Sequence, residues 1–318
     1  MPKHPARTLH KPQLPPTEPP TISPRWLATA VGITFVAALF CGWAALCFIF
    51  WQGSWQLLYH PAKAVTRTPA SIGLNFDAVG FAATEAGVPR LRGWWIPASP
   101  GATNARYTAL YLHGASGNLS DTLPALIRLH AAGLNILAFD YRGYSQSQLA
   151  RPSEAHWRED AEWALDYLTG TRHIALNSIV LAGDDLGASL ALEVAANHPG
   201  LAGVVLTEPD TNPLAPIFTD ARARLVPAHT LVRDRWDLMA PAEQLRVPSL
   251  WFCRTAPPGI MAPPAPPEIF EKVTAPKSLV WLTRDTSDQS EPIERFLTAW
   301  LRDLPNQARN IPIQQLAD

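Results

Sequence analysis

The chain has 318 residues, a length that suits one catalytic-sized domain with an additional segment. Its 26 Lys and Arg residues balance 27 Asp and Glu residues, and this balance argues against a nucleic-acid partner. The three cysteines do not form a disulfide framework, because Cys41 and Cys47 lie in one apolar segment and Cys253 in another. No His or Cys spacing typical of a metal site occurs, so we expect neither a metal nor a cofactor.

The N-terminal region predicts a membrane anchor. Residues 1–25 are rich in proline and are expected to form a disordered tail. Residues 26–51 contain no charged side chain, and about 20 apolar residues suffice to span a bilayer. The apolar region of a cleavable signal peptide is shorter, roughly 7–15 residues. We therefore interpret residues 26–51 as a single transmembrane segment.

The flanking charges predict the orientation of this segment. Basic residues precede it at Lys3, Arg7, Lys11 and Arg25, and fewer follow closely, at Lys63 and Arg67. Positive charge favours the cytoplasmic side. The N-terminus is thus expected in the cytoplasm, with the C-terminal domain on the outer side, periplasmic or extracellular. Aromatic residues suited to the membrane interface stand at both ends of the segment: Trp26, Trp51, Trp55 and Tyr59.

Residues 60–305 alternate between strand-like and helical segments, and residues 306–318 form a C-terminal tail. Apolar, strand-like runs occupy residues 74–83, 91–98, 107–114, 134–140, 178–185, 203–208, 247–254 and 277–284. Helical patterns occupy residues 122–133, 154–169, 187–198 and 291–304. This alternation predicts an α/β fold in which a mostly parallel sheet carries helices on both faces. A proline-rich break covers residues 255–268.

Residues 179–192 read IVLAGDDLGASLAL and contain the spacing of a nucleophile elbow. In the G-x-S-x-G motif, a strand turns sharply into a helix and displays a serine at the turn. Here Gly183 and Gly187 provide the two glycines that the tight crossing requires. Asp185 occupies the position of the serine.

Motifs along the whole domain resemble one family. They are LLYHP, TPASIGLNFDAVGF, LRGWWIPA, YLHGASGN, AFDYRGYSQS, LAGDDLGAS, LVRDRWD and VPSLWF, in that order. The domain resembles α/β-hydrolases, specifically the membrane-anchored BEM46-like branch related to serine aminopeptidases. The resemblance implies a nucleophile at the elbow, followed in the chain by an acid and a histidine. It also implies an oxyanion hole formed by the backbone N–H groups of Leu186 and Ala115.

The expected catalytic groups are altered at all three positions. Asp185 carries a carboxylate, and the attack of a carboxylate on an ester would give an anhydride. Enzymes that use an elbow aspartate attack an sp³ carbon instead. These enzymes also need a histidine. The triad histidine belongs in the loop of residues 283–292, but no histidine follows His229 in the sequence. The acidic residues of this loop are Asp285 and Asp288, followed by Glu291. The segment for the acid has no Asp or Glu before Glu268. Losing one triad member typically reduces the rate by about 10⁴- to 10⁶-fold.

Replacement groups are conceivable at a few positions. His229 lies between the sixth and seventh strands of the expected sheet and is the one histidine that we consider as a base. Glu208 or Asp210 are relocated acids, and Ser116 or Ser189 are replacement nucleophiles, although Ser189 should lie on the helix after the elbow. His113, His198 and the turn Asp140–Ser147 are interpreted as structural.

Three hypotheses follow. The favoured one is a membrane-anchored protein of hydrolase fold that is catalytically impaired or inactive and binds a small-molecule ligand or a protein partner. The alternative is an active hydrolase with a rebuilt site, in which Asp185 acts as nucleophile or water-positioning base with His229 or Asp285. A third is a scaffolding membrane protein that acts through its proline-rich tail.

Overall fold

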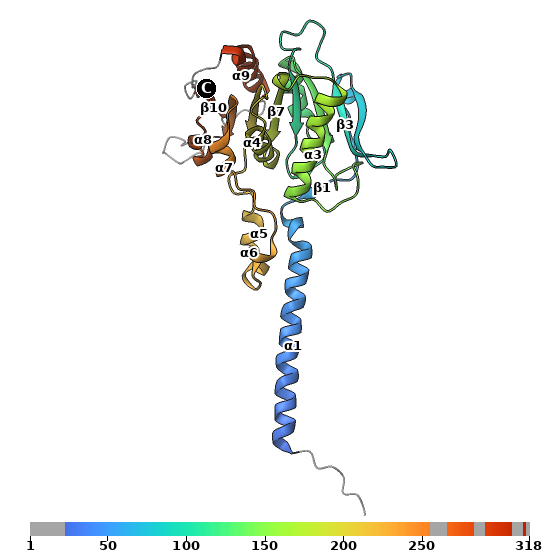
Figure 1. The fold of residues 1–318 in the computed structure, drawn as a ribbon, viewed down its shortest axis with the longest axis vertical. Coiled ribbons are helices and arrows are strands. Elements are labelled where there is room, and N and C mark those ends of the chain that lie inside the picture. Colours follow the sequence, from blue (N-terminus) through green and yellow to red (C-terminus); the bar gives the residue numbers. More distant parts are fainter. Residues whose placement is uncertain (1–22, 255–265, 283–289, 307–313, 316–318) are drawn as a thin grey trace, which may run out of the picture. The chain divides into compact units, whose positions relative to one another are not determined.

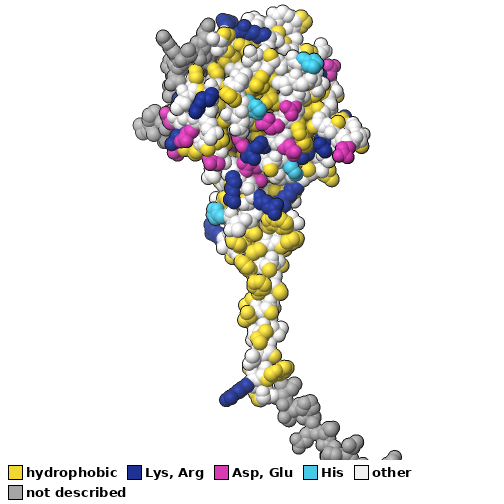
Figure 2. Space-filling view, in the orientation of Figure 1, with side chains coloured by type: hydrophobic (Ala, Val, Ile, Leu, Met, Phe, Trp, Pro, Cys, Tyr) yellow, Lys and Arg dark blue, Asp and Glu magenta, His cyan; other side chains and the backbone are white. Residues whose placement is uncertain are grey.

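The computed structural model describes residues 23–254, 266–282, 290–306 and 314–315. The chain divides into two units, Met1–Ile49 and Phe50–Asp318. In the first unit, the described residues belong mainly to helix α1 (Pro24–Gly53, 30 residues), whose last residues enter the second unit. Apolar side chains cover the surface of α1 (Figure 2), and by length and composition this helix is able to cross a membrane. At 1.5 Å per residue it is about 45 Å long.

The second unit alternates strands with helices (Figure 1). Its strands are β1 (His60–Pro61), β2 (Asp77–Ala83), β3 (Pro89–Ile96), β4 (Thr108–Leu112), β5 (Ser116–Gly117), β6 (Asn135–Asp140), β7 (Ile179–Asp184), β8 (Gly203–Thr207), β9 (Ser249–Arg254), β10 (Lys277–Leu282) and β11 (Gln314–Gln315). Its α-helices are α2 (Leu123–Ala131), α3 (Glu154–Asp166), α4 (Leu186–Asn197), α5 (Ala215–Thr219), α6 (Ala228–Leu231), α7 (Met239–Gln244), α8 (Glu268–Lys272) and α9 (Ser290–Asp303). Short 3₁₀ turns are η1 (Ser54–Leu57), η2 (Pro69–Ile72), η3 (Leu119–Asp121), η5 (Leu176–Ser178), η6 (Ala221–Arg224) and η7 (Leu304–Asn306), and η4 (Tyr167–Thr171) is a π-helix.

The main sheet has nine strands in the order β11-β10-β9-β8-β7-β4-β6-β3-β2. Strand β3 runs antiparallel to both of its neighbours, β2 and β6, whereas every other neighbouring pair in this order is parallel. Strands β1 and β5 form a separate two-stranded parallel sheet. The mostly parallel sheet predicted from the sequence is confirmed.

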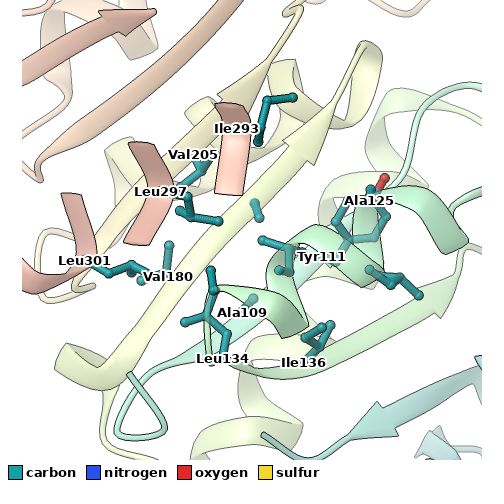
Figure 3. Packing of buried hydrophobic residues seen from close by; sticks show 14 of the residues in the cluster. Ala109, Tyr111, Ala125, Leu134, Ile136, Val180, Val205, Ile293, Leu297 and Leu301 are labelled. Atoms are coloured by element: carbon teal, nitrogen blue, oxygen red, sulfur yellow. The ribbon is translucent and has the colours of Figure 1, made fainter. Parts of the chain in front are cut away.

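Helices cover both faces of the sheet, which is why its central strands are apolar along their whole length. Every residue of β4 is buried, as expected for a strand with helices on both sides. Figure 3 shows one face, where sheet residues Ala109, Tyr111, Ile136, Val180 and Val205 meet helices α2 and α9. Helices α3 and α4 pack together elsewhere on the sheet, and α4 is buried over most of its length.

The structure adds detail that the sequence pattern did not predict. The helix predicted over 154–169 is α3, which ends at Asp166 and continues as the π-helix η4. The short helices α5 and α6, joined by η6, form a segment between β8 and β9. Cys253 is a free, buried residue in β9. The predicted N-terminal tail, the proline-rich break and the C-terminal tail lie largely outside the described residues.

Candidate functional site

The candidate site lies at the edge of the sheet where the parallel strands β4, β7, β8 and β9 end. Leu112 of β4 is paired with Gly183 of β7, and Asp184 at the end of β7 is paired with Thr207 of β8. The loop after β4 and the turn after β7 therefore lie side by side. Sites of open α/β sheets form at the carboxyl ends of their strands, which is where these segments meet.

The turn between β7 and α4 holds Asp185 in a backbone conformation that is rare for a residue with a side chain. Its φ is 54° and its ψ is −125°. Hydrogen bonds fix the turn from both sides, because the Asp185 N–H donates to the Thr207 carbonyl at 3.0 Å and the Asp185 carbonyl accepts from the Ala188 N–H at 3.0 Å. Such a conformation costs about 1–3 kcal/mol and persists only where the surroundings determine it.

Two glycines allow this turn. A Cβ atom on Gly187 would stand 2.1 Å from the Leu112 carbonyl oxygen, and a Cβ atom on Gly183 would stand 2.3 Å from the Gly187 carbonyl oxygen. Both neighbours are backbone atoms of the central sheet or of α4, so they have little room to move. The geometry at these two positions is that of a strand crossing closely beneath the helix that follows it.

The carboxylate of Asp185 lies against the loop that follows β4. A Cβ atom on Gly114 would stand 3.0 Å from Asp185 Oδ2. Burial raises the pKa of the Asp185 carboxyl, and the nearby charge of Asp210 raises it further. Hydrogen bonds from the backbone N–H groups of Leu186 and Ala115 act in the opposite direction and lower this pKa, since they stabilise the charged form.

These two N–H groups are the ones that the sequence predicted as oxyanion donors. In a serine hydrolase with this arrangement, they would stabilise the negative oxygen that develops on the substrate. Here they act on the protein's own carboxylate. The Asp185 carboxylate thus lies close to the donors that an incoming oxyanion would need.

Two tyrosines and a histidine orient the loop after β4. Tyr144 Oη donates to the Ala115 carbonyl at 2.7 Å, and Tyr141 Oη donates to the His113 carbonyl at 3.2 Å. His113 Nδ1 lies 2.8 Å from the Gly114 carbonyl oxygen. With all three carbonyls engaged by these groups, the Ala115 N–H is left to face Asp185. Sequence reasoning missed this role of the two tyrosines, although both stand in the motif AFDYRGYSQS.

The structure places His229 in the short helix α6, where its side chain is exposed. The imidazole stacks on the ring of Phe218, with 4.2 Å between the ring centroids. Among the described residues, the groups that shift the pKa of Asp185 do not include His229. The role of His229 as a base therefore stays a prediction without a contact to support it.

The candidate acids are engaged elsewhere. Arg254 Nε donates to Glu208 Oε1 at 2.6 Å, and Asp210 Oδ1 accepts from the Asn212 N–H at 2.9 Å. Asp285 and Asp288 lie outside the described residues, as does most of the segment between β9 and α8. Within the described part of the chain, no group of three His, Cys, Asp or Glu side chains is placed to hold a metal ion.

The two serines considered as replacement nucleophiles are not displayed at the turn. Ser189 is buried within α4, and its Oγ donates to the Asp210 carbonyl at 3.2 Å. Ser116 is exposed in β5, where it pairs with His60 of β1. The side chain displayed at the elbow is that of Asp185.

His113 belongs to the core beneath the loop. Its ring is fully buried among aromatic side chains, including Tyr141 and Trp157, and its Nε2 lies 3.6 Å from Asp140 Oδ1. Burial lowers the pKa of His113 to about 4, so the imidazole is neutral at pH 7. Burial also raises the pKa of Asp140 to about 7, although the N–H of Leu119 partly opposes the shift.

We expect the unfolding free energy of the Asp140→Asn variant to exceed that of the parent by an amount that grows as the pH rises. Because the folded-state pKa of Asp140, about 7, exceeds its ordinary value of 3.8, the folded state retains a proton that the unfolded state has lost between these values. The unfolding free energy of the parent should therefore fall as the pH rises from 3.8 to about 7. The Asp140→Asn variant lacks the ionisable carboxyl, so its unfolding free energy should not show this fall. The gain in unfolding free energy should reach roughly 1–3 kcal/mol above pH 7 and vanish below pH 4, measured by denaturant unfolding.

The exposed Asp77 of β2 gives a matched control. Asp77→Asn changes the charge by the same amount without altering a buried carboxyl. If the difference in unfolding free energy between Asp140→Asn and the parent stays constant from pH 4 to pH 8, the raised pKa of Asp140 is contradicted.

Comparison with known proteins agrees with this arrangement. The profile of the alpha/beta hydrolase family matches residues 109–313. An uncharacterized protein of Mycobacterium tuberculosis (strain ATCC 25618 / H37Rv) is 32% identical over 162 residues, 51% of this chain and 56% of that protein. The alpha/beta hydrolase domain-containing protein WAV2 of Arabidopsis thaliana is 29% identical over 189 residues, 55% of this chain and 59% of WAV2. Protein bem46 of Schizosaccharomyces pombe is 31% identical over 105 residues, 33% of this chain and 35% of bem46.

The chain thus spans about half the length, or less, of these curated relatives. Among solved structures, the Pyrococcus furiosus esterase Pf2001 superposes with a TM-score of 0.55 at 17% identity, covering 79% of this chain and 99% of the esterase. The alpha/beta hydrolase GrgF from Penicillium sp. sh18 superposes with a TM-score of 0.53 at 18% identity, covering 74% of this chain and 99% of GrgF. At these identities the likeness concerns the fold.

Proposed function

Because the chain belongs to the alpha/beta hydrolase family, as its BEM46-like motifs predicted, we propose that it is a membrane-anchored member that no longer turns over esters or amides. It retains the fold to bind a small-molecule ligand or a protein partner. One observation carries this proposal: the Asp185 carboxylate stands at the elbow against the loop that follows β4, where the N–H groups of Leu186 and Ala115 lower its pKa.

This arrangement opposes ester hydrolysis in two ways. A substrate carbonyl would have to displace the carboxylate from its two donors before its oxygen gained any stabilisation. A carboxylate so close to the developing oxyanion would also repel it, whereas an oxyanion hole stabilises that charge by several kcal/mol, about 2.7–4 for a single donor. The site therefore lacks the main electrostatic contribution of the family's mechanism as well as a serine.

The alternative of a rebuilt hydrolase requires a base within hydrogen-bond reach of Asp185. The imidazole of His229 instead stacks on Phe218, and the candidate acid Glu208 pairs with Arg254. Both contacts weigh against a working dyad with Asp185. The scaffolding hypothesis depends on residues 1–25, most of which lie outside the described residues.

Anchoring rests on helix α1. Its surface is apolar, and Arg25 is its only charged residue. The excess of positive charge before the helix supports an orientation with the N-terminus in the cytoplasm and the domain on the outer side.

The proposal is tested by ester hydrolysis. The purified full chain, solubilised in a non-ionic detergent, is expected to release p-nitrophenol from p-nitrophenyl butyrate at the rate of buffer alone. The Asp185→Ala variant should give the same rate, since Asp185 performs no chemistry, while an esterase with an intact triad serves as the positive control. Turnover by the parent that Asp185→Ala abolishes would establish the rebuilt hydrolase instead.

A further inference from the structure

A pocket of about 670 Å³ lies within the second unit, and its lining does not include the elbow residues Gly183, Asp185 and Gly187. It is lined by the end of α1 with η1, by residues 151–158 at the start of α3, and by residues 231–237. These segments lie far apart in the sequence and meet around Trp51 and Trp55. Figure 2 shows Lys and Arg side chains gathered at the end of the domain that carries α5 and α6, labelled in Figure 1.

The acidic side chains of this pocket already have partners. Asp234 Oδ2 accepts from Tyr59 Oη at 2.7 Å, and its Oδ1 accepts from the Glu154 N–H at 3.2 Å. Arg158 pairs with both Glu154 and Glu193. Glu154, Glu193 and Asp234 are thus taken up by bonds that hold the wall together, and the exposed Asp237 accepts from the Met239 N–H at 3.0 Å.

Three arginines of the pocket differ from Arg158 in this respect. In the part of the chain that the structure describes, no carboxylate lies within salt-bridge distance of Arg151, Arg233 or Arg235. Arg151 donates to the Trp51 carbonyl at 2.9 Å, and the Arg233 guanidinium lies 5.3 Å from the centroid of the Trp51 ring.

Arg151 and Arg233 are close enough to affect each other. Burial lowers the pKa of the Arg151 guanidinium. The negative charge of Asp234 opposes this shift, and the smaller effect of the positive charge of Arg233 adds to it. A further anion between the two guanidinium groups would relieve their mutual repulsion. Arginine forks match phosphate oxygens in geometry and charge, so a phosphate is the anion that this arrangement suits.

We propose that this pocket binds the phosphate of an anionic phospholipid through Arg151 and Arg233. The proposal rests on the membrane anchoring proposed above, because Trp51 is the last residue of the predicted transmembrane segment, 26–51, and headgroups would lie within reach of it. Indole rings favour the headgroup region of a bilayer, and both Trp51 and Trp55 line the pocket. The lipid would thereby hold the domain at the membrane surface and give Arg151 and Arg233 an anionic partner in addition to the bonds of Arg151 to the Trp51 carbonyl and to Gln52 Oε1.

The test uses the full chain in non-ionic detergent micelles, with lipid binding measured by native mass spectrometry. Phosphatidylglycerol is expected to bind more tightly than phosphatidylcholine. In the double variant Arg151→Gln/Arg233→Gln, the ratio of the two affinities should fall by about tenfold. The pair Arg151→Lys/Arg233→Lys should retain part of it, because lysine keeps the charge but not the fork. Arg106→Gln/Arg302→Gln removes the same charge from exposed positions elsewhere and should behave as the parent.

The outcomes separate this proposal from the one on which it rests. Sodium carbonate extraction of membranes that contain the full chain tests anchoring independently of the arginines. Equal binding of the two lipids by the parent, or an unchanged preference in the double glutamine variant, would overturn the lipid site. Glycerol 3-phosphate binding as tightly as phosphatidylglycerol would also overturn it, by showing that a soluble phosphate compound is the ligand.

Discussion

Replacing Gly187 by alanine is expected to prevent the domain from reaching a stable native fold. The new Cβ atom would stand 2.1 Å from the Leu112 carbonyl oxygen and 2.4 Å from the His113 carbonyl oxygen. Both are backbone atoms at the end of β4, a central strand that pairs with β6 and β7. Relief therefore requires α4 to move away from the sheet.

The expected loss exceeds about 3 kcal/mol, above the usual range for overpacking, because the obstructing atoms are backbone rather than side chain. A domain has roughly 5–15 kcal/mol of stability in total, so the variant should accumulate in aggregates or unfold at a much lower temperature. Soluble yield and thermal unfolding followed by circular dichroism measure this result.

Gly170 in η4 supplies the matched control. A Cβ atom there meets nothing within 4 Å, and the residue has no positive φ. Gly170→Ala should change the unfolding free energy by less than about 1 kcal/mol. If Gly187→Ala unfolds at the same temperature as Gly170→Ala, helix α4 does not cross the sheet as closely as described.

The sheet could be predicted from the sequence because strands that are buried on both faces consist of nearly continuous runs of apolar residues. The six residues of β7 include five that are fully enclosed, and the pattern Ile-Val-Leu-Ala-Gly shows this directly. The helix α9 was equally visible, since its buried residues Ile293, Leu297, Trp300 and Leu301 recur at helical spacing. The spacing of Gly183 and Gly187 likewise predicted the turn at Asp185.

Other features depend on contacts that no local pattern encodes. The pKa of Asp185 is lowered in part by the Ala115 N–H, which the loop after β4 brings from 70 positions earlier in the chain. The pocket beside Trp51 combines Trp51, Arg151 and Arg233, which lie in three segments far apart in the sequence. The two-stranded sheet of β1 and β5 has only two residues in each strand, too few for any periodicity.

Restoring a serine at the elbow is expected not to restore catalysis. Asp185→Ser places a hydroxyl at the turn and frees the N–H groups of Leu186 and Ala115 for a substrate oxygen. Among the described residues no histidine contacts this position as a base, since His229 stacks on Phe218, and no histidine follows His229 in the sequence. Labelling by a fluorophosphonate probe should stay at least about 10³-fold slower than in a serine hydrolase with an intact triad.

The same variant should nonetheless be more stable than the parent. Burial raises the pKa of Asp185, so at neutral pH its charged form opposes folding, and serine removes that charge. A gain in the unfolding free energy at pH 7 that shrinks as the pH falls toward 4, measured by denaturant unfolding, would show that the variant is folded. A stable variant that the probe leaves unlabelled separates loss of chemistry from loss of structure. Rapid labelling of Ser at this position, abolished by His229→Ala, would instead show that a base still serves the elbow.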